Sequence, residues 1–123
     1  MSDVVVTVPK GLWAEWIGEG DLPEAPDESM VSHFWLPAPL PHMERGDRVY
    51  IVAHGLLRGF SPLRGIERRC SLRPGVGCLM RAGGAVAVTI AEPIRGFRGW
   101  RYRWWERADE VPFPDWMTKG AAL

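Results

Sequence analysis

Residues 99–105 alternate between two kinds of side chain, and this pattern constrains the fold more than any other stretch of the sequence. In a β-strand, successive side chains point to opposite faces. Rings fall on one face, at Trp100, Tyr102 and Trp104, and mostly arginines on the other, at Arg101, Arg103 and Trp105. A face of guanidinium groups must stay in water or meet a partner. The pattern therefore predicts a surface strand of a small β-protein, whose rings either build the core or stack on a ligand.

The rest of the chain is typical of short strands separated by turn residues. Runs rich in β-branched and aromatic residues predict strands at residues 3–8, 31–36, 48–53, 56–60, 78–81 and 85–91. His54-Gly55 suits a two-residue hairpin turn, because both residue types tolerate positive φ. We therefore expect residues 50–52 to pair with residues 56–58. A second hairpin is expected from 78–81 to 85–91, through the turn Ala82-Gly83-Gly84.

One short helix is expected between the first strand and residue 20. Leu12, Trp13, Trp16 and Ile17 fall on one face of such a helix, and Gly18 ends it. Two tryptophans on one helical face most often pack against a sheet. We therefore expect Trp13 and Trp16 to lie in the core.

These elements predict one small domain over residues 1–123. The expected fold class is mainly β with short helices (α+β), a small pseudo-barrel of about six strands with an N-terminal helix. No run approaches the ~20 apolar residues that a membrane span needs. The first residues lack the basic, apolar leader of a secretion signal. We therefore expect a cytoplasmic protein without a membrane partner.

Charge is distributed unevenly although the net charge is zero. Residues 1–44 carry one lysine and eight acids, whereas residues 45–107 carry thirteen arginines and four acids. Such a split predicts either an anionic partner for the basic section or internal pairing between the two halves. We expect Arg98, Arg101 and Arg103 to form a continuous positive surface.

Aromatic rings and arginines supply the ingredients of a nucleic-acid site. Unpaired bases stack on rings, and phosphates accept paired hydrogen bonds from guanidinium groups. The candidate ligand-binding residues are Trp35, Tyr50, Arg58, Arg98, Trp100, Arg101, Tyr102, Arg103 and Trp104.

Signals for catalysis are sparse. The sequence has neither a Gly-x-Ser-x-Gly nucleophile motif nor a Gly-x-x-x-x-Gly-Lys-Ser/Thr phosphate loop. Its three histidines do not show paired ligand spacing, so we assign no metal and no cofactor. The weak catalytic candidates are Lys10 and Glu15, as base and orienting group.

Residues 46–60 carry a family resemblance. The run Gly46-Asp47-Arg48-Val49-Tyr50-Ile51-Val52, a glycine turn and then Leu57-Arg58-Gly59-Phe60 resemble the PUA-like superfamily, and within it the ASCH and EVE domains. The resemblance implies a pseudo-barrel that binds RNA or a modified nucleobase in an aromatic-walled cleft. The ASCH signature Gly-x-Lys-x-x-Glu-x-Arg is absent near the first helix, which weighs against the hydrolytic activity of some ASCH proteins.

The sequence thus favours a nucleic-acid-binding module that holds RNA or a modified nucleobase in an aromatic and arginine cleft. Two alternatives stay open. One is an ASCH-like hydrolase, a ribonuclease or amidohydrolase. The other is a protein-interaction module, in which exposed tryptophans act as anchors.

Overall fold

The structure is a computed structural model that describes residues 2–18, 27–36, 39–68, 77–83 and 85–118. Within these residues, strands dominate and helix is confined to short segments, which confirms the mainly β fold class. In chain order the elements are β1 (Val4–Thr7), η1 (Lys10–Leu12), α1 (Trp13–Gly18), β2 (Asp27–Leu36), β3 (Arg48–Ala53), β4 (Leu56–Glu67), β5 (Gly77–Gly83), β6 (Val88–Thr89), β7 (Trp100–Tyr102), η2 (Arg107–Asp109) and β8 (Val111–Pro112).

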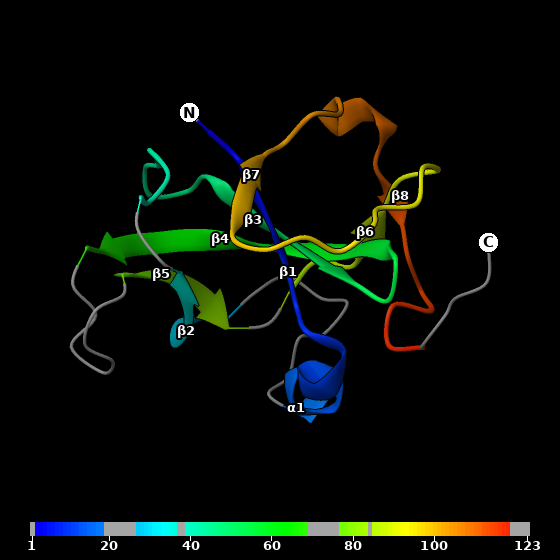
Figure 1. Ribbon diagram of the computed structural model, residues 1–123, viewed down its shortest axis with the longest axis horizontal. Coiled ribbons are helices and arrows are strands. Elements are labelled where there is room, and N and C mark those ends of the chain that lie inside the picture. The colour runs from blue at the N-terminus through cyan, green and yellow to red at the C-terminus, as the bar shows by residue number, and fades with distance from the viewer. Residues whose placement is uncertain (1, 19–26, 37–38, 69–76, 84, 119–123) are drawn as a thin grey trace.

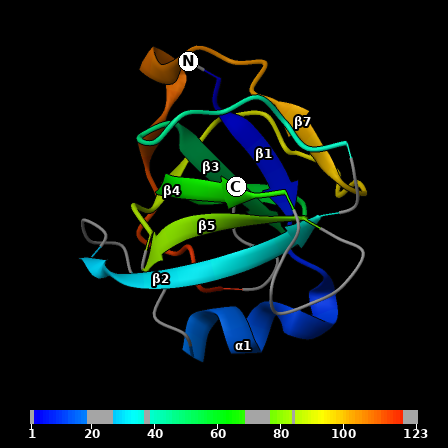
Figure 2. The same ribbon diagram turned by 90° about the vertical axis from the view of Figure 1, so that its left-hand side faces the viewer.

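Six strands form one mixed sheet in the order β2-β5-β4-β3-β1-β7. β1 runs parallel to β3, and the other neighbours are antiparallel. The sheet curls into a half-barrel, with α1 below it (Figures 1 and 2). In the described residues, no helix is both long and apolar enough to cross a bilayer.

The β3–β4 hairpin is confirmed, but a register shift makes Tyr50 and Ile51 pair with Phe60 and Gly59, beyond the expected residues 56–58. Ala53 pairs with Leu56 and Val52 pairs with Leu57 around the turn. His54 and Gly55 both have positive φ, 49° and 77°. Positive φ at both central residues is the geometry that matches the twist of a two-residue hairpin. This hairpin places His54 at the end of β3.

β4 is long because it serves two neighbours in turn. Its first half pairs with β3 up to Pro62, and from Leu63 onward it pairs with β5. A register shift next to Gly59 bends the strand on the β3 side. There Phe60 and Val86 exchange both backbone hydrogen bonds, at 3.0 and 2.9 Å. Through this bridge, the segment after β5 lies against β4.

The second predicted hairpin, from 78–81 to 85–91, is wrong. β5 has β2 on one edge and β4 on the other, so neither edge is open to residues 85–91. Instead Val86 bridges Phe60, and β6 pairs with β8. Gly84, part of the expected turn, lies outside the described residues. The local hairpin does not form because the pairing of β5 with β2 and β4 already uses the backbone hydrogen-bonding groups of β5.

The strand predicted for residues 99–105 is shorter in the structure than the alternating pattern of the sequence suggested. β7 pairs with β1 only over Trp100–Tyr102. Beyond it, the Arg103 amide donates to the Asp3 carbonyl, and Trp105 turns into the core, where it is 9% exposed. The alternation therefore holds for one short strand at the sheet edge and ends at Tyr102.

Apolar side chains from β1 and β3 fill both sides of the sheet. Val4 and Val6 pack into one cluster, whereas Val5 packs into another with Tyr50 and Trp105. Trp13 and Trp16 of α1 are buried in a third cluster, as expected from their spacing. Leu12 is the exception on that face, with 43% of its surface exposed.

Candidate nucleic-acid interface

A cleft of about 350 Å³ opens where β1, the β3–β4 turn and the loop before β7 meet. We call it the Phe97 cleft. Its lining residues come from three separate stretches of the chain: Thr7, Val8, Pro9, Val52, His54, Gly55, Gly96, Phe97 and Arg98. The volume is at the lower end of the range for small-ligand pockets, roughly 300–1,000 Å³.

Three hydrogen bonds hold the walls of the Phe97 cleft together. The Val8 amide donates to the Val52 carbonyl at 2.8 Å, and the Ile94 amide donates to the Gly55 carbonyl at 2.9 Å. The Phe97 amide donates to the Thr7 hydroxyl at 3.2 Å. The yellow-to-orange loop before β7 therefore crosses the end of β1, as Figure 1 shows. These bonds connect the three stretches that line the cleft.

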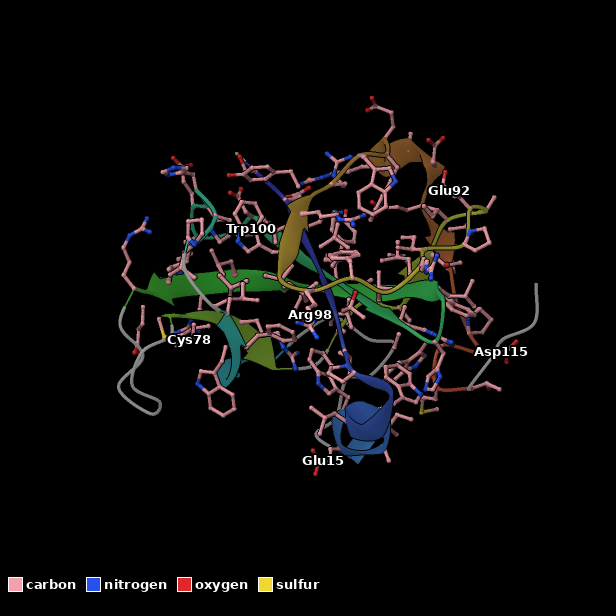
Figure 3. All side chains as sticks on the ribbon, viewed as in Figure 1. Glu15, Cys78, Glu92, Arg98, Trp100 and Asp115 are labelled. Carbon is pink, nitrogen blue, oxygen red and sulfur yellow. The ribbon has the colours of Figure 1, made fainter. Side chains whose placement is uncertain are left out.

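Arginines surround the entrance. Arg98 lines the cleft and is exposed, and Arg95 and Arg101 are exposed on the same loop and on β7. The Arg101 guanidinium lies over the Phe97 ring, with Cζ 4.3 Å from the ring centre. In the part of the chain that the structure describes, no carboxylate lies within ion-pair distance of these three arginines. Figure 3 shows Arg98 near the centre of this face.

Trp104 extends the aromatic surface beyond Phe97. Its ring centre lies 6.4 Å from that of Phe97, and its side chain is 45% exposed. The Trp104 indole donates to Glu92 at 3.3 Å, and its ring packs edge-on against Trp105. Arg101, Phe97 and Trp104 thus form a continuous row of planar groups beside the cleft.

Trp100 and Tyr102 point to the other face of β7 and contact each other, with ring centres 4.8 Å apart. The Trp100 indole donates to the Pro39 carbonyl at 2.9 Å, and the Tyr102 hydroxyl accepts from the His42 amide at 3.2 Å. Neither ring lines the Phe97 cleft. Both rings hold the segment before β3 against the sheet edge, although Tyr102 stays 43% exposed.

Arg103 does not join the positive surface that we expected. It donates to the Asp3 carboxylate at 3.1 Å and to the Trp105 carbonyl. Arg107 also forms an ion pair with Asp3, with 2.8 Å between its Nη2 and the Asp3 Oδ2. Burial raises the pKa of Asp3, but hydrogen bonds from the Arg48 amide, Arg107 and Arg103 outweigh it and lower the pKa overall. Of the three arginines expected together, Arg103 is paired, whereas Arg98 and Arg101 have no carboxylate partner among the described residues.

Tyr50 is buried and does not present its ring. The ring packs between Phe60 and Trp105, and the hydroxyl donates to Glu110 at 2.6 Å. Burial, followed by the bond to Glu110, raises the pKa of Tyr50 to about 12. Arg48 completes this group with an ion pair to Glu110 at 3.1 Å.

The other candidates lie away from the cleft. Trp35 is exposed on β2, the edge strand opposite β7 in the sheet order. Arg58 is 2% exposed and lies inside the core. Glu15 points away from the sheet below α1 (Figure 3), and the side chain of Lys10 lies outside the described residues. Among the described residues, no group of three His, Cys, Asp or Glu side chains is placed to hold a metal ion.

Of the residues that line the Phe97 cleft, only Arg98 was among the predicted ligand-binding residues. His54 was predicted only as a turn residue, and Phe97 was not among the ligand-binding candidates although it adjoins Arg98. Two features of the sequence could have indicated these residues. A hairpin turn places its residues at the rim of a sheet, and Phe97 lies between Gly96 and Arg98 in the basic stretch.

No protein-family model, curated protein or solved structure matches the chain.

Proposed function

We propose that the protein binds single-stranded nucleic acid, as RNA or as a strand that carries a modified base, with one base in the Phe97 cleft. The observation that carries this proposal is the position of free arginines around a cleft of nucleobase scale. The walls are apolar at Val8, Pro9, Val52 and Phe97, which suits the faces of a planar ring. A paired base cannot enter such a cleft without leaving its stack, so an unpaired base is the natural occupant.

Phosphates on either side of that base would meet the arginines. Arg98 stands at the cleft itself, and Arg95 and Arg101 flank it in sequence. An arginine without a carboxylate partner keeps all its donors available for phosphate oxygens. Trp104 offers a second ring, on which a neighbouring base would stack at the exposed face.

The architecture also supports membership of the PUA-like superfamily, which we propose with the function. The half-barrel contains a parallel β1–β3 pair, a long bent β4 and a helix after β1. Gly46-Asp47 forms the turn before β3, where the Asp47 carboxylate accepts from the Glu44 amide at 2.9 Å. These features support the proposed membership.

The test is binding of labelled single-stranded oligonucleotides, measured by fluorescence anisotropy over a range of salt concentrations. Arg98→Ala and Arg101→Ala should each weaken binding. Each should also reduce the slope of log K against log salt by about 0.7, because one phosphate contact releases fewer counterions. Arg45→Ala is the matched control, since Arg45 is exposed and precedes the opposite end of β3.

Two results would overturn the proposal. One is the absence of binding at low salt for mixed-sequence RNA, DNA and modified nucleosides alike. The other is an equal loss of affinity in Arg45→Ala, because that would mean a diffuse charge effect without a defined interface.

A further inference from the structure

Thr7 carries the polar side chain in a run of valines, residues 4–8, that forms β1 and its end. The alternation of a strand puts Thr7 on the same face of β1 as Val5. Val5 is fully buried, in the apolar cluster against which Phe97 packs. Valine has nearly the same shape as threonine but lacks the hydroxyl group. The hydroxyl group of Thr7 therefore adds hydrogen bonding that packing on this face does not require.

The Thr7 side chain contacts the loop before β7 at two points. Its Oγ1 accepts from the Phe97 amide at 3.2 Å. Its Cγ2 lies 3.2 Å from the position that a Cβ would take at Gly96. Thr7, Gly96 and Phe97 all line the Phe97 cleft, and Thr7 is partly exposed. Thr7 therefore lies at the wall of the cleft, where the loop meets the end of β1.

The Thr7 hydroxyl group has one hydrogen to donate. A hydroxyl group accepts at its oxygen and donates its single hydrogen. The oxygen accepts from the Phe97 amide, whereas no atom of the described residues accepts the hydrogen. A ligand oxygen in the cleft can accept it.

The other polar groups at the cleft also suit a ligand that accepts hydrogen bonds. The Arg98 guanidinium only donates, and no Asp or Glu is among the described residues that line the cleft. The Val52 and Gly55 carbonyls already accept from main-chain amides, at 2.8 and 2.9 Å. The His54 ring lies edge-on to Trp13, with 6.0 Å between ring centres, and an imidazole can either donate or accept. The side chains of the cleft therefore offer mainly donors.

We propose that the Phe97 cleft selects bases with an exocyclic oxygen, such as uracil, and that the Thr7 hydroxyl group donates to this oxygen. The inference rests on the proposed nucleic-acid function and narrows its ligand class. Uracil and hypoxanthine carry an oxygen where cytosine and adenine carry an amino group. An amino group would bring its own hydrogens towards the donors of Thr7 and Arg98. An oxo base is therefore favoured over an amino base of the same shape.

Oligonucleotides with a single base test this selection. Each strand carries uracil, cytosine, hypoxanthine or adenine between abasic nucleotides, and a fully abasic strand measures the contribution of the phosphates. Binding to the full-length protein is followed by fluorescence anisotropy. The uracil and hypoxanthine strands should bind about tenfold more tightly than the cytosine and adenine strands, because the amino bases leave a donor unpaired.

Variants of Thr7 test the donor itself. Thr7→Val keeps the shape and removes the hydroxyl group, so the uracil and cytosine strands should bind equally. Thr7→Ser keeps the hydroxyl group and should retain the preference for uracil. Thr118→Val changes an exposed threonine outside the cleft and should behave like wild type. A loss of affinity in Thr7→Val by the same factor for all four bases would overturn the donor role, because Thr7 would then only position the loop.

The wild-type protein alone separates this inference from the proposed function. Failure to bind every strand at low salt would overturn the nucleic-acid function. Tighter binding of the four base-containing strands than of the abasic strand, without a difference between uracil and cytosine, would leave that function standing and overturn the selection.

Discussion

The carboxylate of Asp3 accepts hydrogen bonds from two distant parts of the chain, the start of β3 and the segment after β7. It accepts from the Arg48 amide, the Arg103 guanidinium and the Arg107 guanidinium at 2.8–3.1 Å. Asp3 itself is buried next to the start of β1. One carboxylate therefore ties β1, β3 and the segment after β7 together, and it also removes Arg103 and Arg107 from the free positive surface.

Asp3→Asn should be destabilising at neutral pH. The change removes the ionised acceptor of several charge-assisted hydrogen bonds, whereas Arg103 and Arg107 are partly exposed to solvent, so the expected loss is about 1–3 kcal/mol in the free energy of unfolding. The pKa of folded Asp3 is lowered, so its contribution is present above the unfolded value of about 4 and is lost as the pH falls through the folded pKa. Urea unfolding of wild type and variant, at neutral pH and at about pH 3 or below, should show the difference shrinking in acid.

Asp109→Asn is the control for this prediction, because Asp109 is exposed in η2. It should change the free energy of unfolding by no more than about 0.5 kcal/mol. A difference between wild type and Asp3→Asn that stays constant across the acid range would contradict the role of the ionised carboxylate.

Among the elements, β4 organises the fold because three partners meet along it. It pairs with β3 over residues 56–62 and with β5 from Leu63 onward, and Val86 bridges Phe60 within the part that pairs with β3. The bridge lies beside Gly59, where an added Cβ would lie 2.5 Å from the Val86 carbonyl oxygen. A glycine at this position is therefore required by the close approach of another backbone.

Gly59→Ala should reduce the free energy of unfolding by about 1–3 kcal/mol, because the new methyl group must push the Val86 backbone away. Gly11→Ala is the matched control, since nothing lies within 4 Å of a Cβ at Gly11. It should be neutral within about 0.5 kcal/mol. Urea denaturation compares the two, and amide exchange at Val86 should rise only in Gly59→Ala. Equal free energies of unfolding for the two variants would show that the Val86 backbone can move away from residue 59 without loss of stability.

Across the whole molecule, the tryptophans separate into structural and presented groups. Trp13, Trp16, Trp105 and Trp116 are buried, whereas Trp35 and Trp104 are exposed; Trp100 is partly buried and belongs with the structural group. Charge separates in the same way: Asp3 and Glu110 form ion pairs with Arg103, Arg107 and Arg48, whereas Arg98 and Arg101 have no carboxylate partner in the parts of the chain that the structure describes. Stability and the proposed binding therefore rest on different residues.

This separation predicts opposite behaviour for two tryptophan variants. Trp104→Ala should weaken oligonucleotide binding by about 1–3 kcal/mol through lost stacking, with the salt slope nearly unchanged. Its thermal unfolding should stay close to that of wild type. Trp116→Ala should cost about 3–5 kcal/mol of stability, because it opens a cavity in the core. Anisotropy and calorimetry on both proteins check this, and unfolding of Trp104→Ala would show that its ring is structural.

The sequence was informative wherever neighbouring residues decide the outcome. Periodicity placed β1, β3 and the buried face of α1, and the His54-Gly55 turn placed the first hairpin, because turn chemistry sets the pairing of adjacent strands. The same reasoning failed for residues 85–91. Their expected partner, β5, was already paired on both edges by strands that its local sequence does not specify.

By itself, the sequence determined a small, mainly β protein with a basic and aromatic stretch near its last sheet strand. Only the tertiary structure decided which of those groups are available. Arg103 meets Asp3 from a hundred positions away, and Arg58 meets the carbonyls of the C-terminal segment. The Phe97 cleft likewise needs three stretches, at residues 7–9, 52–55 and 96–98. The physical reason is that a charge is free or paired, and a ring is buried or presented, according to contacts between segments that share no local pattern.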